Sequence, residues 1–368
     1  MIKKLAIVLV FGSVVGGALA APLGLPPVPV PESNPQTPEK IALGDKLFHD
    51  ARFSADGKVS CATCHSQAKA FTDNLPVSKG FNGMTGTRNA PTVINSAYMK
   101  TLFWDGREPD LEGQSKQPPI NPVEGGLPDH GPILAVIRKD SDYVEAFKDV
   151  FGVDASTINM DHVAKAIASF ERTVVAGDSP FDRYYFAGDE KAMTPEQTRG
   201  LAVFTGKGRC VSCHRIEQTQ ALFMDNRFHN IGVGFKKIRG KEALTAEQFL
   251  HDKRKGADVD VTVLTRQNMS ELGRFAVTEN ITEVGAFKTP TLRNIDKTGP
   301  YMHDGSLETL ADVVDFYNNG GRVKETDPVS AFLSGGIRPL DLSDDEKSDL
   351  VEFMKALTSP DLDRFTKR

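Results

Sequence analysis

The chain has 368 residues, enough for two domains of ordinary size. Apolar residues make up 39% of it and charged residues 25%, a composition that favours a packed core and excludes a disordered or multi-span membrane protein. The 44 Lys and Arg residues are outnumbered by 49 Asp and Glu residues, which leaves a net charge of −5. Because the chain has no basic excess, we do not expect nucleic acid as a partner.

The first 20 residues are typical of an export signal. Lys3 and Lys4 precede an apolar run over 5–20 that ends in small residues, and we expect cleavage after Ala20. A membrane anchor is the alternative, but this run is shorter than the ~20 residues that span a bilayer, and it contains glycines. No later apolar run is long enough to span. The sequence therefore predicts a periplasmic protein with no stable membrane span.

Helical patterns dominate the rest of the chain. The segment over 21–38 is rich in proline and is predicted to form an extended arm. Between the helical patterns lie a turn-rich stretch over 72–132 and a long polar segment over 215–283, and no run alternates with the period of a strand. The sequence therefore predicts a mainly α fold. Helices are expected over 39–50, 133–151, 161–177, 194–206, 306–321 and 344–359. Two of them begin at capping boxes, Thr194 with Gln197 and Ser343 with Glu346.

All four cysteines lie in two C-x-x-C-H patterns, the attachment signal of c-type haem. A zinc site is the alternative, but neither pattern has a second ligand pair at finger spacing. In each pattern we expect two thioethers to the haem and a histidine below the iron, whose sixth position decides between electron transfer and oxygen chemistry. The residues are Cys61, Cys64 and His65 in the first pattern, and Cys210, Cys213 and His214 in the second.

The two halves share one plan. Each has a helix, a haem motif, an irregular stretch and a closing amphipathic helix. This weak repeat predicts two cytochrome c-like domains, each built round one covalently attached haem. We place the first domain at 39–185 and the second at 186–368.

Four further motifs carry a family resemblance. They are TGTRNAPTVINSA (85–97), FWDGR (103–107), the run from LEGQ to NPVE (111–124), and FKTPTLRN with PYMHDG (287–305). Together they resemble the bacterial dihaem cytochrome c peroxidase and MauG-type family across nearly all of the chain beyond the signal. The resemblance implies hydrogen peroxide as the oxidant, a peroxidatic N-terminal haem on His65, and a calcium ion between the haems.

The resemblance also implies roles for single residues. Glu124 stands at the place of the catalytic acid/base, a group that takes and returns a proton during peroxide cleavage. Gln114 matches a glutamine that hydrogen-bonds the bound oxidant, and Pro118 matches a proline that limits access to the pocket. Trp104, the only tryptophan, matches a residue that relays electrons between the haems. The calcium ligands are implied to be Asn89, Thr298 and Pro300, the last two through backbone oxygens.

Two positions depart from the ordinary peroxidase pattern. Many members cap the peroxidatic iron with a histidine where this chain has Phe81, so we expect that iron to be open, with Met84 as a lesser alternative ligand. At the second haem, Tyr317 replaces the usual methionine, as in MauG-type enzymes, and an anionic oxygen ligand favours oxidised iron. The rival sixth ligands are Met302, Tyr301 and His303.

Both departures predict a MauG-like peroxidase that shares oxidising equivalents between two haems and oxidises an external donor. Because no second tryptophan exists, Tyr184 or Tyr185 would serve as the exit to a protein substrate. The first alternative is a cytochrome c peroxidase supplied with electrons by a small cytochrome c or cupredoxin. An alternative of another class is a non-catalytic dihaem electron carrier, which Glu124 and Gln114 argue against.

Overall fold

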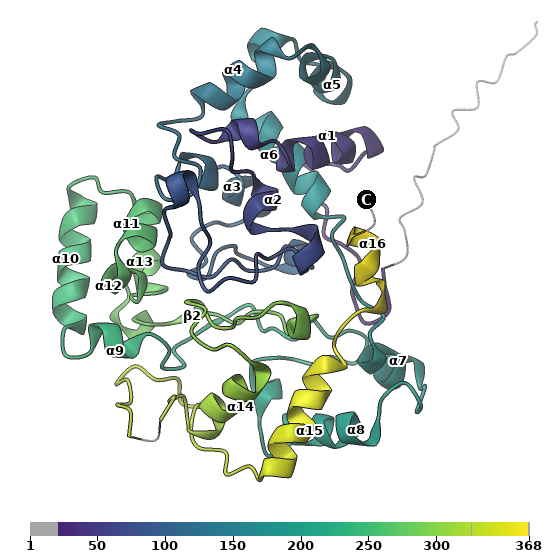
Figure 1. The fold of residues 1–368 in the computed structure, drawn as a ribbon, viewed down its shortest axis with the longest axis vertical. Coiled ribbons are helices and arrows are strands. Elements are labelled where there is room, and N and C mark those ends of the chain that lie inside the picture. The colour runs from purple at the N-terminus through teal and green to yellow at the C-terminus, as the bar shows by residue number, and fades with distance from the viewer. Residues whose placement is uncertain (1–20, 325, 367–368) are drawn as a thin grey trace, which may run out of the picture.

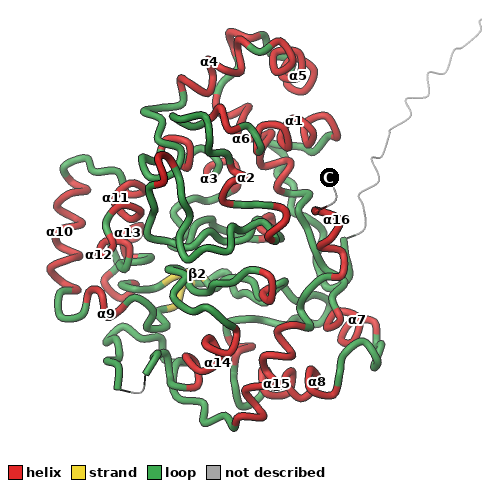
Figure 2. Tube along the Cα trace, viewed as in Figure 1, coloured by secondary structure: helices red, strands yellow, loops and turns green. Residues whose placement is uncertain are grey.

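A computed structural model describes residues 21–324 and 326–366 (Figure 1). The predicted export signal over 1–20 lies outside the described residues. Within the described part, no helix combines the length and the apolar character needed to cross a membrane. Helices surround a centre that consists largely of loops (Figure 2), and the prediction of a mainly α fold is confirmed.

In the first half, a helix at each end encloses the core. The opening helix is capped by the Thr37 side chain, which accepts a hydrogen bond from the Lys40 amide. It crosses the closing helix at Gly44, where a Cβ atom would lie 1.9 Å from the Ala166 carbonyl oxygen. The helices of this half are α1 (Pro38–Phe48), α2 (Cys61–Cys64), α3 (Leu111–Gln114), α4 (Gly131–Lys139), α5 (Ser141–Phe151) and α6 (Met160–Glu171).

The second half repeats this arrangement with α8 (Pro195–Thr205) and α15 (Asp344–Lys355), which cross at Gly200. A Cβ atom there would lie 2.0 Å from the Asp349 carbonyl oxygen. Both helices begin at the expected capping boxes. The other helices are α7 (Pro180–Ala187), α14 (Leu310–Asn318) and α16 (Asp363–Thr366), which ends the described chain against the core of the first half.

An unpredicted group of helices fills most of the segment that the sequence presented as polar. It has its own apolar core, which includes Phe249, Val263 and Phe275. The expectation of an irregular segment over 215–283 was wrong here for two reasons. The long helix over 242–254 buries only Thr245, Ala246 and Phe249 and so shows no clear apolar face, and the other four helices have at most seven residues, too few to display a helical period. We name this group the helical insert; it consists of α9 (Phe235–Ile238), α10 (Glu242–Arg254), α11 (Val259–Thr265), α12 (Gln267–Ser270) and α13 (Phe275–Thr278).

One short antiparallel pair of strands connects the segments before and after the helical insert. In it β1 (Phe228–His229) and β2 (Phe287–Lys288) place Phe228 opposite Lys288 and His229 opposite Phe287. Strands of two residues show no alternation, so the sequence had no period from which to predict them.

The proline-rich arm has no helix before Pro38 and runs along both halves. The Gly24 carbonyl accepts a hydrogen bond from Arg293 of the second half, and the Pro26 carbonyl accepts one from Tyr98 of the first. Residue 185 lies inside α7, and Phe181 of that helix packs in the core of the second half. We therefore propose a domain boundary before α7 in place of residue 185.

The loops of the two halves form a structural repeat. Thr92 and Thr291 each donate to a carbonyl in the loop after the haem motif, both at 2.7 Å. The Leu102 and Tyr301 amides each close the same seven-residue turn, by donating to the carbonyls of Glu108 and Leu307. The equivalent residues keep identical spacing: Pro91, Thr92, Asn95, Asp105 and Leu111 in the first half, and Pro290, Thr291, Asn294, Asp304 and Leu310 in the second.

Candidate active site

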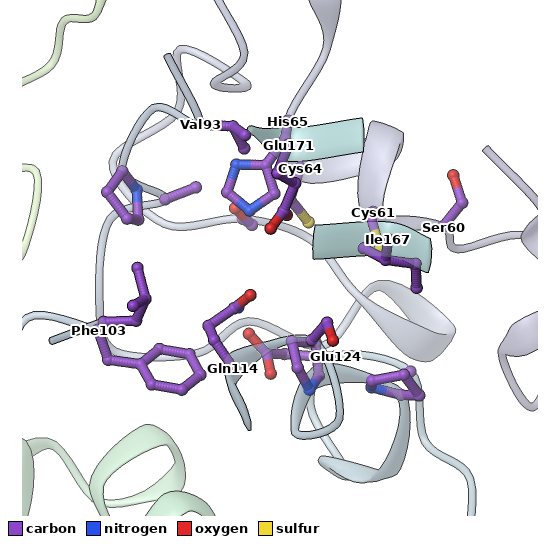
Figure 3. A pocket seen from close by; sticks show the side chains of 18 of the residues that line it. Ser60, Cys61, Cys64, His65, Val93, Phe103, Gln114, Glu124, Ile167 and Glu171 are labelled. Carbon is purple, nitrogen blue, oxygen red and sulfur yellow. The ribbon is translucent and has the colours of Figure 1, made fainter. Parts of the chain in front are cut away.

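A cavity of about 180 Å³ lies in the first half, and the first haem motif forms part of its wall. In Figure 3, His65 and Cys64 lie on one side of this cavity, and Gln114 and Glu124 lie on the other. Pro118 and Trp104 also line it. The structure thus brings the sequence-predicted residues of the first haem site together around one space.

Each haem-motif histidine is oriented by a backbone carbonyl. His65 Nδ1 lies 3.2 Å from the Phe71 oxygen, and His214 Nδ1 lies 2.8 Å from the Phe223 oxygen. Both phenylalanines adopt a left-handed backbone, with φ of 56° and 52°, which turns their carbonyls toward the rings. A neutral ring that donates from Nδ1 keeps the lone pair of Nε2 for a metal.

The residues that line the cavity suit a c-type haem. Cys61 and Cys64 stand at one edge, where the thioethers would form, and buried apolar side chains complete the walls. One oxygen each of Glu124 and Glu171 is buried without a hydrogen-bond partner. An apolar space with an oriented imidazole, two thiols and unpartnered polar atoms is what a covalently bound haem requires.

Glu124 is carried by a short loop after the turn that holds Pro118. Its amide donates to the Asn121 carbonyl at 3.1 Å, and its carbonyl accepts from the Phe81 amide at 2.6 Å. Burial and the nearby Asp260 carboxylate raise the pKa of Glu124 to about 8, while Arg107 acts in the opposite direction. The carboxyl is therefore mainly protonated at neutral pH and can both give and take a proton near it.

Two charged residues of the cavity were missed by the sequence analysis. Glu171 is the last residue of α6, and burial raises its pKa to about 8. Lys288 in β2 donates from Nζ to the Thr101 carbonyl at 2.7 Å, and burial lowers its pKa to about 8. No motif marks Glu171, because α6 resembles any amphipathic helix. Lys288 lies in the motif FKTPTLRN, but the motif does not show that this side chain reaches the cavity of the first half.

Trp104 lies at the junction of the two halves. Its indole Nε1 donates to the Asn89 carbonyl at 2.9 Å, and its own carbonyl accepts from the Lys288 amide at 2.8 Å. The Asn89 amide donates to the His303 carbonyl at 2.8 Å. The loop of Asn89 therefore lies against the loop that follows Thr298 and Pro300.

The second haem motif lies near α14. Burial, together with the thiols of Cys210 and Cys213, raises the pKa of Tyr317, which places this phenol beside the motif. His303 is engaged elsewhere, since its Nε2 lies 2.8 Å from a Glu271 oxygen and its ring stacks on Phe287. The Tyr301 hydroxyl donates to the Ile295 carbonyl at 3.1 Å.

Comparison with known proteins identifies the family. A family model described as di-haem cytochrome c peroxidase matches residues 38–191. Cytochrome-c peroxidase IdrP1 of Denitromonas iodatirespirans is 39% identical, over 93% of this chain and 88% of its own length. The chain belongs to the dihaem cytochrome c peroxidase and MauG family. Methylamine utilization protein MauG of Methylorubrum extorquens is also similar, at 36% identity over 90% of this chain and 81% of its own.

A solved structure supports the same assignment. A MauG-like protein associated with microbial copper homeostasis has a TM-score of 0.76 and 34% identity, covering 93% of this chain and 96% of its own. Membership of the dihaem peroxidase family makes the chain an oxidoreductase with two c-type haems. The carrier alternative is set aside on this ground.

The position at which many dihaem peroxidases have a capping histidine is occupied by an apolar side chain. Phe81 lies against Gly126, where a Cβ atom would approach its ring to 2.6 Å. Met84, the alternative ligand, is 38% exposed and does not line the cavity. The methionines that line it are Met99, whose sulfur accepts a hydrogen bond from Lys288, and Met160.

Proposed function

We propose that this protein reduces hydrogen peroxide at a haem held in the first cavity and shares the oxidising equivalents with a second haem. An external donor, a protein or a small molecule, then supplies the electrons, as in a MauG-like enzyme. Each peroxide consumes two electrons and two protons and yields two waters. The proposal includes a periplasmic location and cleavage after Ala20.

The observation that carries the proposal is the position of Glu124. Its buried carboxyl faces the first haem motif across the cavity, and one of its oxygens has no partner. Peroxide cleavage requires a group that takes a proton from one oxygen and returns it to the other. We assign Glu124 to that transfer, Gln114 to holding the oxidant by a hydrogen bond and Pro118 to limiting its access, and their common position at the cavity supports this assignment.

The haems would be held by the two motifs. Cys61 and Cys64 would bind the first by thioethers, with His65 as the proximal ligand, and the second motif would act likewise. The bound haems supply the redox chemistry, accepting and passing on single electrons. Trp104, which bridges the two halves by hydrogen bonds, is proposed as the relay between them.

The structural repeat supports Tyr317 as the sixth ligand of the second haem. Continuing the spacing shared by the two halves pairs Tyr317 with Pro118, which lines the first cavity on the side of Glu124. Tyr317 would thus stand opposite His214. His303 and Tyr301 already have hydrogen-bond partners, so they compete less well for that place.

Calcium is proposed at the contact between the loops of Asn89 and of Thr298 and Pro300. The Asn89 amide group donates from Nδ2 to the Leu75 carbonyl at 2.8 Å, which leaves its side-chain oxygen as the atom available to a cation. A hard cation prefers such oxygen ligands.

The alternative function remains peroxide removal with electrons from a small cytochrome c or cupredoxin, because related proteins include both a cytochrome-c peroxidase and a MauG protein.

The test of the function is Glu124→Gln in the haem-loaded protein. We expect both haem spectra to be retained and peroxide cleavage to slow by ~10²–10⁴-fold, the usual cost of removing a positioned acid/base. Glu171→Gln is the matched control, since it changes a second buried carboxyl of the same cavity on the side of His65. Equal rates in Glu124→Gln and the native protein would remove Glu124 from the reaction.

A further inference from the structure

Asp260 extends from the helical insert of the second half to two residues beside the cavity of the first, Arg107 and Asn121. It lies on α11, is 7% exposed, and its two oxygens bind different partners. Oδ1 accepts from Arg107, with Nε at 2.8 Å, and Oδ2 accepts from Asn121 Nδ2. Both partners lie in the first half, so a charge contributed by the insert is buried beside the site.

Asn121 transmits this contact to the loop of Glu124. It is 1% exposed, and its side-chain oxygen accepts from the Val123 amide at 3.1 Å. Its carbonyl accepts from the amides of Glu124 at 3.1 Å and Gly126 at 2.9 Å. A continuous path of hydrogen bonds therefore runs from Asp260 through Asn121 to the backbone of Glu124.

The same region holds a set of buried ion pairs, with the buried Lys288 as a further basic group near Asp105. Arg107 bridges Asp260 and Asp105, and Asp105 also pairs with Arg88 at 2.5 Å. Two carboxylates thus face two guanidinium groups, and all four residues are buried or nearly so. Without the Asp260 charge, Arg107 would share one carboxylate with Arg88 and leave a net positive charge near Glu124.

We propose that Asp260 is a positioning residue for Glu124, which fixes the 121–126 loop through Asn121 and balances the charge of Arg107. This inference rests on the proposed function, in which Glu124 handles the proton of peroxide cleavage. It assigns the helical insert a part in that step. The docking of the insert is reinforced by Val123, which packs against the insert core, and by Thr87, which donates to the Val263 carbonyl at 2.7 Å.

The charges that face Glu124 define the expected effect on its titration. Asp260 from α11 raises the pKa of Glu124 and Arg107 lowers it. The thiols of Cys61 and Cys64 face it from α2, and they carry no charge as thioethers. Removing the Asp260 charge removes the repulsion that raises the pKa of Glu124. It also leaves the positive charge of Arg107 less neutralised, and this too lowers the pKa of Glu124.

The experiment compares Asp260→Asn with the native haem-loaded protein. Protonated Glu124 is followed by its infrared carboxyl C=O stretch, assigned by its loss in Glu124→Gln. We expect the titration midpoint of this band to fall by about one pH unit or more in Asp260→Asn, and the pH dependence of peroxide cleavage to move with it. Asp258→Asn is the matched control, because Asp258 caps the same helix from an exposed position and Asn caps equally well.

The outcomes separate the inference from the proposed function. An unchanged midpoint in Asp260→Asn, with Glu124→Gln still slow, overturns the inference alone. Full activity in Glu124→Gln overturns the proposed function. Asp260→Ala tests whether Asp260 fixes the 121–126 loop. We expect the amides of this loop to exchange hydrogen faster in Asp260→Ala than in Asp260→Asn. Equal exchange in the two variants would show that Asp260 does not fix the loop. If Asp260→Ala does not fold, the titrations of Glu124 in Asp260→Asn and in the control Asp258→Asn decide.

Discussion

Glu124 shows how burial and a neighbouring charge change the chemistry of a common residue. A glutamate in a loop is normally a solvated charge, and here one oxygen is buried without a partner. Desolvation disfavours the ionised form, and Asp260 adds a like charge, so the pKa rises to about 8. The group is therefore poised near neutral pH, where a side chain exchanges protons most efficiently.

The raised pKa predicts the pH dependence of peroxide cleavage. At neutral pH Glu124 is mainly protonated, and only its ionised form can take a proton from peroxide. The rate should therefore rise as the pH increases through about 8 and level off above it. Rapid-mixing measurements on both sides of this value check the prediction, and the inflection should vanish in Glu124→Gln. A rate that falls over this range would contradict the assignment of Glu124 as the base.

Tyr317 determines the expected behaviour of the second haem. If its phenolate is the sixth ligand, Tyr317→Met should raise the reduction potential of that haem, because an anionic oxygen donor favours the oxidised iron. Tyr317→Phe should open the same iron to water and leave the first haem unchanged. Spectroelectrochemistry and electron paramagnetic resonance distinguish the two haems. An unchanged low-spin spectrum in Tyr317→Phe would transfer the role to a rival such as Met302.

At the scale of elements, the two helix crossings explain why glycine occurs inside well-formed helices. Glycine costs helix stability, about 1 kcal/mol relative to alanine. At Gly44 and Gly200 that cost is offset, because the backbones of α1 and α6, and of α8 and α15, approach too closely for any side chain. The halves therefore share one packing solution, although each forms its own core.

Gly44→Ala should destabilise the protein despite the better helix propensity of alanine. The new Cβ atom would overlap the Ala166 carbonyl, and overpacking of this kind costs typically about 1–3 kcal/mol. Urea unfolding of the haem-loaded protein measures the change. Glu39→Ala, at an exposed site in the same helix, is the control and should change the free energy of unfolding by less than about 0.5 kcal/mol. A Gly44→Ala protein as stable as the control would contradict the close crossing.

At the scale of the whole molecule, the arm, α7 and the central loops meet at Arg293. Arg293 is 2% exposed and forms a bidentate ion pair with the Asp182 carboxylate, with both N···O distances at 2.8 Å. It also donates to the Ala221 and Gly24 carbonyls. One buried guanidinium group thereby connects segments that are distant in the chain.

Arg293→Met should be strongly destabilising. It leaves the Asp182 carboxylate buried without a counter-ion, and breaking a buried pair in this way costs about 3–5 kcal/mol. The matched control is Arg183→Met, which removes an exposed Arg–Asp pair with Asp178 and should cost at most about 1 kcal/mol. Chemical unfolding of both variants gives the comparison. Similar losses in the two would show that the buried pair of Arg293 and Asp182 does not hold the arm, α7 and the central loops together.

The sequence by itself determined the features that depend on short spacing. The first haem motif predicts a haem because one helical turn brings Cys61, Cys64 and His65 together. The start of α15 is predicted for the same reason, since Ser343 and Glu346 are three residues apart. The family motifs indicated Glu124 and Gln114 without showing what surrounds them. Only the tertiary structure placed Glu171 and Lys288 at one cavity and Asp260 against Asn121 in the loop of Glu124, because their contacts join segments far apart in the chain. Burial then altered the pKa values of Glu171 and Lys288, and no local pattern encodes burial of a single charged residue.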